Sequence, residues 1–171
     1  WQKYGYRKNF DITVGSTTNP NVSEKIRKLS DEQYLPYIFK YLSERGFSSF
    51  VYCPGGPPEV SYIRHSTFDI NDGRQSLGIQ NTFSFIQEGM NGKDNFIENL
   101  RHRADGQMAG MHGLLEYVYH NRDRIKTLVT SEREKLITGT TGQKVSIQSE
   151  HVANGQKLVI PLVSYQEGTD T

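Results

Sequence analysis

A short apolar segment followed by a long helical pattern constrains the fold of this chain more than any other feature. Residues 81–87 alternate aromatic or aliphatic with polar side chains, which predicts a buried strand. The strand ends in a carboxylate, Glu88, and is expected to break at Gly89. From about Asp94 to Val129, apolar residues recur every three to four positions, which predicts one long helix. A strand that leads into a helix favours an α/β fold, in which strand ends often carry the chemistry.

The first half of the chain shows the same alternation of helix and strand. Residues 9–15 predict a strand, and Ser30 with Gln33 three positions later has the spacing of a capping box that starts a helix. Gly46 stands where a glycine commonly ends a helix, and residues 47–53 predict a short buried strand. We therefore expect the α/β class, with a mixed sheet and packed helices.

The predicted long helix contains three glycines, each of which costs up to about 1 kcal/mol relative to alanine in a helix interior. They are Gly106, Gly110 and Gly113. Tight packing of that helix face against the sheet would offset the cost.

The character of the sequence changes near residue 131. Residues 144–168 alternate apolar and polar side chains, and the pair Asn154–Gly155 is a strong hairpin turn signal. We therefore expect residues 1–130 to belong to the α/β domain and residues 131–171 to begin a small β module.

Charge and cysteine usage exclude several classes of function. The 171 residues carry a net charge of +1, so charge gives no reason to expect nucleic-acid or membrane partners. No apolar run is long enough for a transmembrane helix. The single cysteine, Cys53, excludes an internal disulfide and a cysteine-rich zinc site, and it is interpreted as a small buried hydrophobic residue. Because the chain opens with Trp1, we interpret it as a piece of a longer protein.

Several side chains are candidates for chemistry. Glu88 is a candidate general base or acid, because partial burial at a strand end disfavours the charged form of a carboxylate. The alternative is a solvated loop glutamate before a glycine. Tyr62 and His65, with an arginine between them, can form a polar pocket, or they can belong to an ordinary surface loop. His112 and Glu116 share a helix face but lack a third metal ligand, so a surface pair is expected.

Residues 62–125 combine these features in an order that resembles a known family. A polar loop is followed by Gly-Ile-Gln-Asn-Thr-Phe-Ser-Phe at residues 78–85, then by an acidic residue, a turn and a long helix. This order resembles the C-terminal part of zinc carboxypeptidases of the carboxypeptidase A-like family. The resemblance implies that residues 1–130 are the C-terminal part of such a domain, and that the parent protein cleaves C-terminal residues from peptides.

Under this resemblance Glu88 matches the catalytic glutamate of the family. The family places its acid directly after the second aromatic residue, where this chain has Ile86. Glu88 lies two residues further on the same strand face, about 7 Å along the strand, and a bulge or shifted strand would restore the register. Either Tyr62 or His65 corresponds to the substrate-facing tyrosine of the family. Two further residues fall in the loop that lines its specificity pocket, namely Arg74 and Asp72.

The resemblance also implies zinc, held in the family by a His-x-x-Glu pair and a later histidine. No His-x-x-Glu occurs in this chain, so we expect the zinc ligands in a missing N-terminal half and no zinc bound to this chain. The family further suggests a secreted or periplasmic location. A half-domain would expose a sheet edge and an apolar face, which favours a homodimer of the fragment.

Two alternatives stay open. The chain can be a non-catalytic binding domain on the same α/β frame, which would explain the displaced acid without a lost half. It can also be an unrelated hydrolase that uses Glu88 together with a histidine such as His65.

Overall fold

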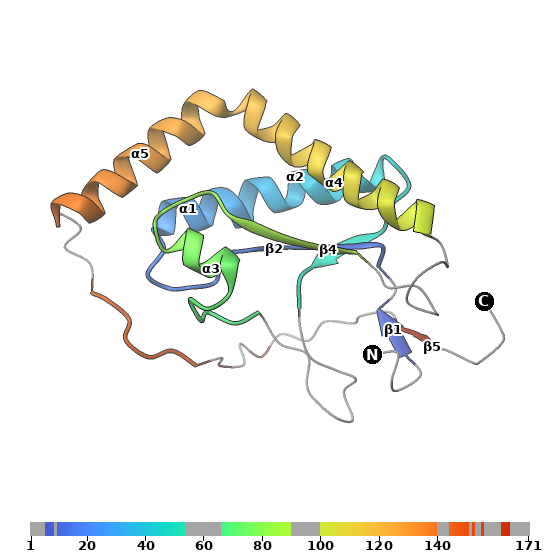
Figure 1. The fold of residues 1–171 in the computed structure, drawn as a ribbon, viewed down its shortest axis with the longest axis horizontal. Helices are drawn as coiled ribbons and strands as arrows, with labels where there is room; N and C mark the ends of the chain where they lie inside the picture. The colour runs from blue at the N-terminus through green and yellow to red at the C-terminus, as the bar shows by residue number, and fades with distance from the viewer. Residues whose placement is uncertain are drawn as a thin grey trace.

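The protein is built on a small mixed sheet whose longer helices lie on one side, with one short helix on the other (Figure 1). The computed structural model describes residues 6–8, 10–53, 66–89, 100–139, 144–150, 152, 155 and 162–164. Strand β2 (Ile12–Ser16) lies at the centre, parallel to β3 (Ser49–Val51) and antiparallel to β4 (Phe85–Gly89). The strand order β3-β2-β4 makes the sheet mixed, as the sequence predicted. Strands β1 (Tyr6–Lys8) and β5 (Leu162–Ser164) form a separate antiparallel pair.

The first helical segment begins earlier than the sequence predicted. Helix α1 (Glu24–Leu29) continues through a π-helical turn, η2 (Ser30–Tyr34), into α2 (Leu35–Ser43). Ser30 is therefore inside the segment, and its hydroxyl donates to the carbonyl of Ile26 instead of capping a new helix. The prediction of a helix start at Ser30 is wrong because the capping-box spacing with Gln33 occurs within a helix that is already formed.

The π turn directly precedes a proline. Pro36 lies in the first turn of α2 and has no N–H to donate to the preceding turn. In η2 the backbone N–H of Leu35 donates to the carbonyl of Ser30, five residues back, which is the π-helical pattern. The wider turn allows the helix to pass the proline without ending.

The end of α2 agrees with the sequence prediction. Gly46 has a φ of 81°, a left-handed conformation that suits glycine, and the N–H of Phe47 donates to the carbonyl of Leu42. This turn leads directly into β3, which confirms the predicted helix–glycine–strand unit, with a shorter strand than residues 47–53.

Strand β4 begins four residues later than predicted, because Asn81 has a left-handed backbone with a φ of 56°. Its buried side chain joins two distant segments. Oδ1 accepts from the backbone N–H of Ser23, at 2.8 Å, and Nδ2 donates to the backbone carbonyl of Glu132, at 3.0 Å. Asn81 therefore serves as a buried polar joint and not as the first residue of the strand.

The core lies between the sheet and the helices. Ile12 and Val14 of β2 pack with residues of α2 such as Ile38 and Leu42, all of which are almost completely buried. Tyr34 stands at the centre of an aromatic cluster. The rings around it are Phe83, Phe85 and Tyr117, with centroids 4.2–5.6 Å from its own. The predicted placement of Phe83 and Phe85 on one face is thus confirmed.

Helix α4 (Leu100–His120) approaches the sheet through its glycines. A Cβ at Gly106 would lie 3.1 Å from Ile12, one at Gly110 would lie 2.0 Å from Gln87, and one at Gly113 would lie 2.5 Å from Ile38. The predicted tight packing of this glycine face is confirmed. Of the predicted apolar pattern, Leu100, Met108, Met111 and Leu115, in contrast, lie on the opposite side of α4 and are exposed, whereas Ile125, further along the pattern, is buried in the core.

The predicted single helix is in fact two. Helix α4 ends at His120, and α5 (Arg122–Thr138) begins after Asn121, whose backbone leaves the helical conformation at φ −110° and ψ 14°. The predicted start of the helix near Asp94 lies outside the described residues.

Helix α5 passes through the predicted domain boundary at residue 131, and buried Glu132 of α5 accepts from the hydroxyl of Ser23 at 2.9 Å. Of the predicted hairpin, only Gly155 is described, with a φ of 78°. No described helix is both long and apolar enough to cross a bilayer.

The glycine face predicts an unusual response to alanine. Substitution of Gly113 by alanine is expected to destabilise the protein by about 1–3 kcal/mol, because overpacking against Ile38 and Tyr41 outweighs the gain in helix propensity of up to about 1 kcal/mol. Thermal or urea unfolding followed by circular dichroism measures the change. Gly73→Ala is the control, since open space surrounds that position. Equal effects of the two substitutions would contradict close packing at Gly113.

The aromatic cluster predicts a loss of stability at alkaline pH. Burial raises the pKa of Tyr34 well above the ordinary value of 10.0, and burial together with Glu116 raises the pKa of Tyr37 to about 12. The folded state therefore binds these protons more tightly than the unfolded state, so the free energy of unfolding is unaffected below about pH 10 and falls as the pH rises further. Tyr34→Phe is expected to reduce that fall, measured by urea unfolding between neutral and alkaline pH. Tyr119→Phe, at an exposed position, should leave the wild-type pH curve unchanged.

Candidate functional site

The face of the sheet opposite α4 carries the polar candidate residues. Glu88 pairs with Thr13, and Ile86 pairs with Gly15, in a ladder that runs without interruption along β4. Because side chains alternate along a strand, and Ile12 and Gln87 contact α4, the side chains of Ile86 and Glu88 point away from that helix. The prediction that these two share a face is confirmed. The described ladder contains no bulge that would move Glu88 back to the position of Ile86.

Gly15 makes room at the centre of this face. An ideal Cβ there would lie 2.8 Å from the Cβ of Tyr52 and 2.9 Å from Nη1 of Arg74. Tyr52 follows β3, and its backbone N–H donates to the carbonyl of Val14. The absent side chain of Gly15 therefore lets a guanidinium and a phenol approach the sheet from two different segments.

Arg74 is positioned by the short helix α3 (Gly73–Gly78). The carboxylate of Asp72 caps this helix by accepting from the backbone N–H groups of Arg74 and Gln75. The helix is fixed to the loop after β2 by Gln75, which is fully buried, accepts from the backbone of Thr18 and Asn19, and donates to Thr18 and Thr67. Asp72, predicted to bind substrate, thus caps the helix that holds Arg74, and its Oδ2 lies 3.5 Å from Nη2 of Arg74.

The Arg74 side chain is only 2% exposed, yet it is incompletely paired. Nη2 donates to the hydroxyl of Ser66, whereas Nε and Nη1 have no hydrogen-bond partner in the part of the chain that the structure describes. Burial lowers the pKa of Arg74, an effect opposed by the negative charges of Asp72 and Glu88. Arginine nevertheless stays charged in proteins, so a cation with two unsatisfied donor nitrogens lies within the fold.

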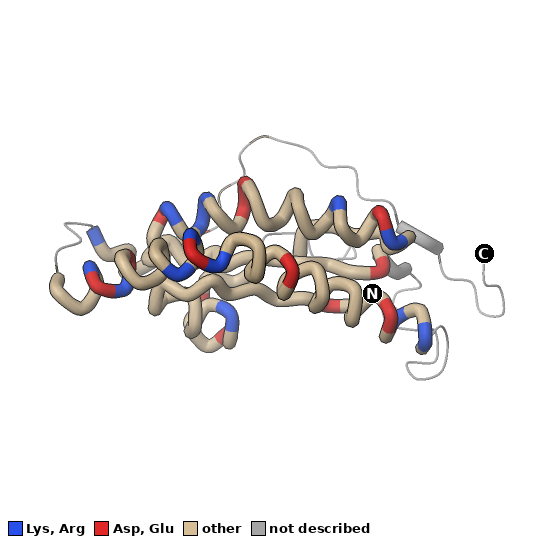
Figure 2. Tube along the Cα trace, turned by 90° about the horizontal axis from the view of Figure 1, so that it is seen from above, with Lys and Arg blue, Asp and Glu red and all other residues tan. Residues whose placement is uncertain are grey.

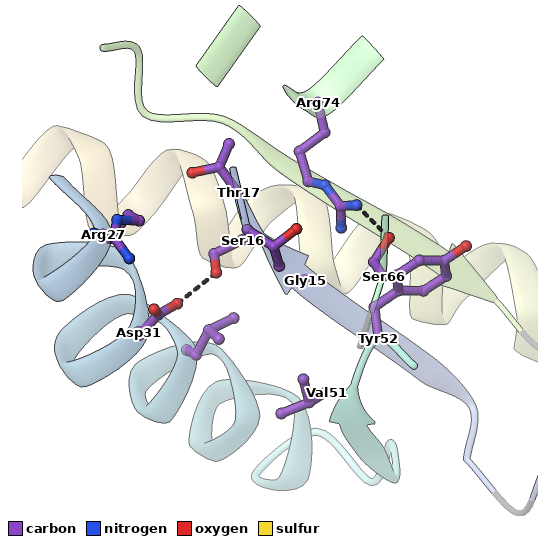
Figure 3. A pocket seen from close by; sticks show the side chains of 11 residues that line it. Gly15, Ser16, Thr17, Arg27, Asp31, Val51, Tyr52, Ser66 and Arg74 are labelled. Atoms are coloured by element: carbon purple, nitrogen blue, oxygen red, sulfur yellow. Dashed lines mark hydrogen bonds between the residues drawn. The ribbon is translucent and has the colours of Figure 1, made fainter. Parts of the chain in front are cut away.

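A cavity of about 430 Å³ lies beside Arg74, at the carboxyl ends of parallel strands β2 and β3 (Figure 3). Arg74, Tyr52 and Ser66 form one end, as Figure 3 shows. At the other end lie Arg27 and Asp31, whose carboxylate accepts from the hydroxyl of Ser16. The remaining lining residues are Gly15, Thr17, Thr18, Leu35 and Val51. Carboxyl ends of parallel strands are the usual place for ligands in α/β folds.

Glu88 is exposed at the end of β4, next to Tyr52. The expectation that burial in the strand would desolvate Glu88 is therefore wrong, because the face that carries it is open. Burial raises the pKa of Tyr52, as do the charge of Glu88 and the hydrogen bond between the two side chains. Glu88 and Arg74 thus both lie close enough to the Tyr52 phenol to affect its protonation.

The other sequence candidates have different outcomes. Tyr62 and His65 lie outside the described residues. Glu116 of α4 accepts from the hydroxyl of Tyr37 at 3.2 Å, and no group of three potential metal-ligating side chains occurs among residues whose positions are described. The chain turns before α3, where the N–H of Asn71 donates to the Asp69 carboxylate and the N–H of Asp72 donates to the Asp69 carbonyl.

Sequence reasoning missed Tyr52 and Ser66. The alternation of Phe50 and Tyr52 along the strand of residues 47–53 places these two side chains on one face, and the pairing of β3 and β4 with β2 makes it the face of Glu88. Ser66 has no such signal, because it lies in a loop.

A second polar cluster joins β2, β3 and α4. Asp11 accepts from the hydroxyl of Ser48 with one carboxylate oxygen, and its other oxygen lies 2.8 Å from Nε2 of His102. The carboxylate stands between the hydroxyl and the imidazole, so the histidine cannot take a proton directly from the serine. This order differs from that of a nucleophilic triad, in which the imidazole stands in the middle.

Comparison of the sequence with protein-family models, with curated proteins and with solved structures found no match. The assignment of chemistry to the open face therefore depends on its geometry and charges alone. Positive and negative residues are interspersed along the described trace, and neither sign gathers on one side (Figure 2).

The incomplete pairing of the guanidinium predicts that Arg74 is not needed for folding. Arg74→Met is expected to leave the free energy of unfolding within about 1 kcal/mol of the wild type or to raise it, since a buried charge with unsatisfied donors is replaced by an apolar side chain of similar size. Gln75→Met, at the next position, removes a fully hydrogen-bonded buried amide and should cost about 2 kcal/mol or more. Urea unfolding followed by circular dichroism measures both. A large loss of stability in Arg74→Met would mean that the guanidinium is structural.

Proposed function

We propose that this chain supplies the proton-transfer side of a carboxypeptidase-like hydrolase, which removes C-terminal residues from peptides. The observation that supports the proposal is the gathering of Glu88, Tyr52 and buried Arg74 on the face of the sheet opposite α4. An acid, a phenol and an incompletely paired cation are the groups needed to move a proton and to hold an anionic substrate.

In this proposal Glu88 takes a proton from the attacking water and returns it to the leaving amine. Its exposure at the end of β4 leaves the carboxylate accessible to a substrate on the open face. Tyr52 hydrogen-bonds to Glu88 and holds the carboxylate in place. The phenol stays protonated in the physiological range, because burial and the charge of Glu88 raise its pKa.

Arg74 recognises the terminal carboxylate of the peptide. Its unpaired nitrogens provide donors for an anion, and the adjoining cavity of about 430 Å³ has room for the terminal residue. Leu35 and Val51 give the cavity an apolar part, while Asp31 and Arg27 line its far end.

Zinc is implied by the family resemblance, but the described residues do not fit it. They contain no group of three or more histidine, cysteine, aspartate or glutamate side chains close together. The roles given to Glu88, Tyr52 and Arg74 therefore include no step that passes through a metal.

A second candidate function is anion binding without catalysis. The exposed position of Glu88 and the two unsatisfied nitrogens of buried Arg74 favour it, because a recognition site requires the cation and the cavity but not the acid. In that case the ligand is a peptide or small molecule that carries a carboxylate.

Glu88→Gln in the protein that contains this chain separates the two functions. Hydrolysis of peptides with a free C-terminus, followed by mass spectrometry, should fall at least about 100-fold, because the general base is lost. Peptides with an amidated C-terminus should not be cleaved by the wild type. Glu134→Gln, at an exposed position on α5, is the control and should keep full activity.

Unchanged turnover in Glu88→Gln would contradict the hydrolase proposal. Binding of a free-carboxylate peptide without cleavage by the wild type, lost in Arg74→Met, would instead support the second candidate.

A further inference from the structure

The outer face of α4 is a continuous apolar stripe that nothing in the described structure covers. Four large side chains on it are 50–64% exposed, and Tyr119 is 65% exposed, whereas the opposite side of the helix is the buried glycine face. We define the α4 stripe as Leu100, Ala104, Met108, Met111, Leu115 and Tyr119. The helix is about 30 Å long. Exposed apolar surfaces of this kind on soluble proteins mark interaction sites.

The order of residues in the α4 stripe is complementary to itself when read backwards. In an antiparallel pair centred between Met108 and Met111, Met108 of one copy faces Met111 of the other. Ala104 then faces Leu115, and Leu100 faces Tyr119. Two of the three pairs combine a smaller with a larger side chain, and the central pair consists of two flexible methionines, which suits closely packed helices.

The charges beside the α4 stripe are complementary in the same arrangement. Arg101, Asp105, His112 and Glu116 all lie along one flank of the stripe at helical spacing, and all are exposed. In a two-fold antiparallel pair, equivalent flanks meet, so Arg101 of one copy lies beside Glu116 of the other, and Asp105 lies beside His112. Opposite charges at such flanking positions set the orientation of paired helices. The other flank carries Arg103 and no acidic residue between residues 100 and 120, so no two acidic side chains face each other along it.

We propose that the α4 stripe is the two-fold interface of a homodimer, in which α4 of one copy packs antiparallel on α4 of the other. The face of the sheet on which α3 lies is on the opposite side from α4 (Figure 1), so this dimer does not cover it. The dimer is therefore independent of the hydrolase proposal.

The oligomeric state of the full 171-residue chain tests the interface. Sedimentation equilibrium or light scattering over a range of concentrations should show a dimer. Met111→Glu should raise the dimer dissociation constant at least 10-fold, because it places two carboxylates at the centre of the interface. Ile137→Glu changes an apolar residue on α5 that is 84% exposed and should leave the dissociation constant unchanged. Circular dichroism checks that both variants keep their helices.

Charge reversal tests the orientation. Arg101→Glu alone should weaken the dimer several-fold, and Arg101→Glu combined with Glu116→Arg should restore it, since the pair is re-formed with inverted sign. A wild-type chain that stays monomeric at every concentration overturns the proposal. A dimer that persists in Met111→Glu also overturns it, because another surface must then hold the copies together. Failure of the double variant to recover, with Met111→Glu monomeric, overturns the antiparallel arrangement.

Discussion

The close approach of α4 to the sheet determines how the rest of the molecule is arranged. Three glycines on one side of α4 let the helix backbone contact Ile12, Gln87 and Ile38 directly. Because glycines take the sheet-facing positions, four large apolar residues of α4 lie on the outer side, although Tyr117 of the same helix is buried among the core aromatics. Helices α1, α2 and α4 lie on one face of the sheet, and the other face carries the short helix α3 and the polar groups that it positions. The three glycines of α4 thus define the packed side of the molecule, and the side opposite α4 is the one that can bind a ligand.

The open face shows how a small fold can hold a buried charge. The lack of a side chain at Gly15 leaves space for the Arg74 guanidinium, and α3 fixes the arginine through the cap provided by Asp72 and the buried amide of Gln75. Burial without full pairing costs stability, and such costs are typical of residues kept for binding rather than for folding. Glu88 differs from Arg74 because it is exposed, so it carries no cost in stability from burial and remains accessible to a ligand.

The sequence predicted the elements whose signals are local, and it failed where distant contacts decide. Gly46 ends its helix as expected, and the alternation around Phe83 and Phe85 correctly placed the core side of β4. Ser30 was mistaken for a helix start, because a serine with a glutamine three residues later looks the same inside a helix as at its beginning. The sequence identifies the packed side of α4 only when the glycines, rather than the leucines and methionines, are taken to face the sheet. Of the candidate site, Arg74 and Glu88 were named from sequence, whereas their relation through Tyr52 depends on strand pairing that no local pattern shows.

The buried joint at Asn81 has a consequence for the way the chain reaches its native state. One amide satisfies the backbone of Ser23 and of Glu132, and these two residues, 109 positions apart, also bond to each other through their side chains. None of the three can bury its polar groups at low cost until the other two have arrived. Segments near the beginning and the end of the described chain must therefore come together before this hydrogen-bond network can form. Contacts of such wide sequence separation are associated with slow folding. On a ribosome, the last step of native assembly has to wait until α5 has left the exit tunnel.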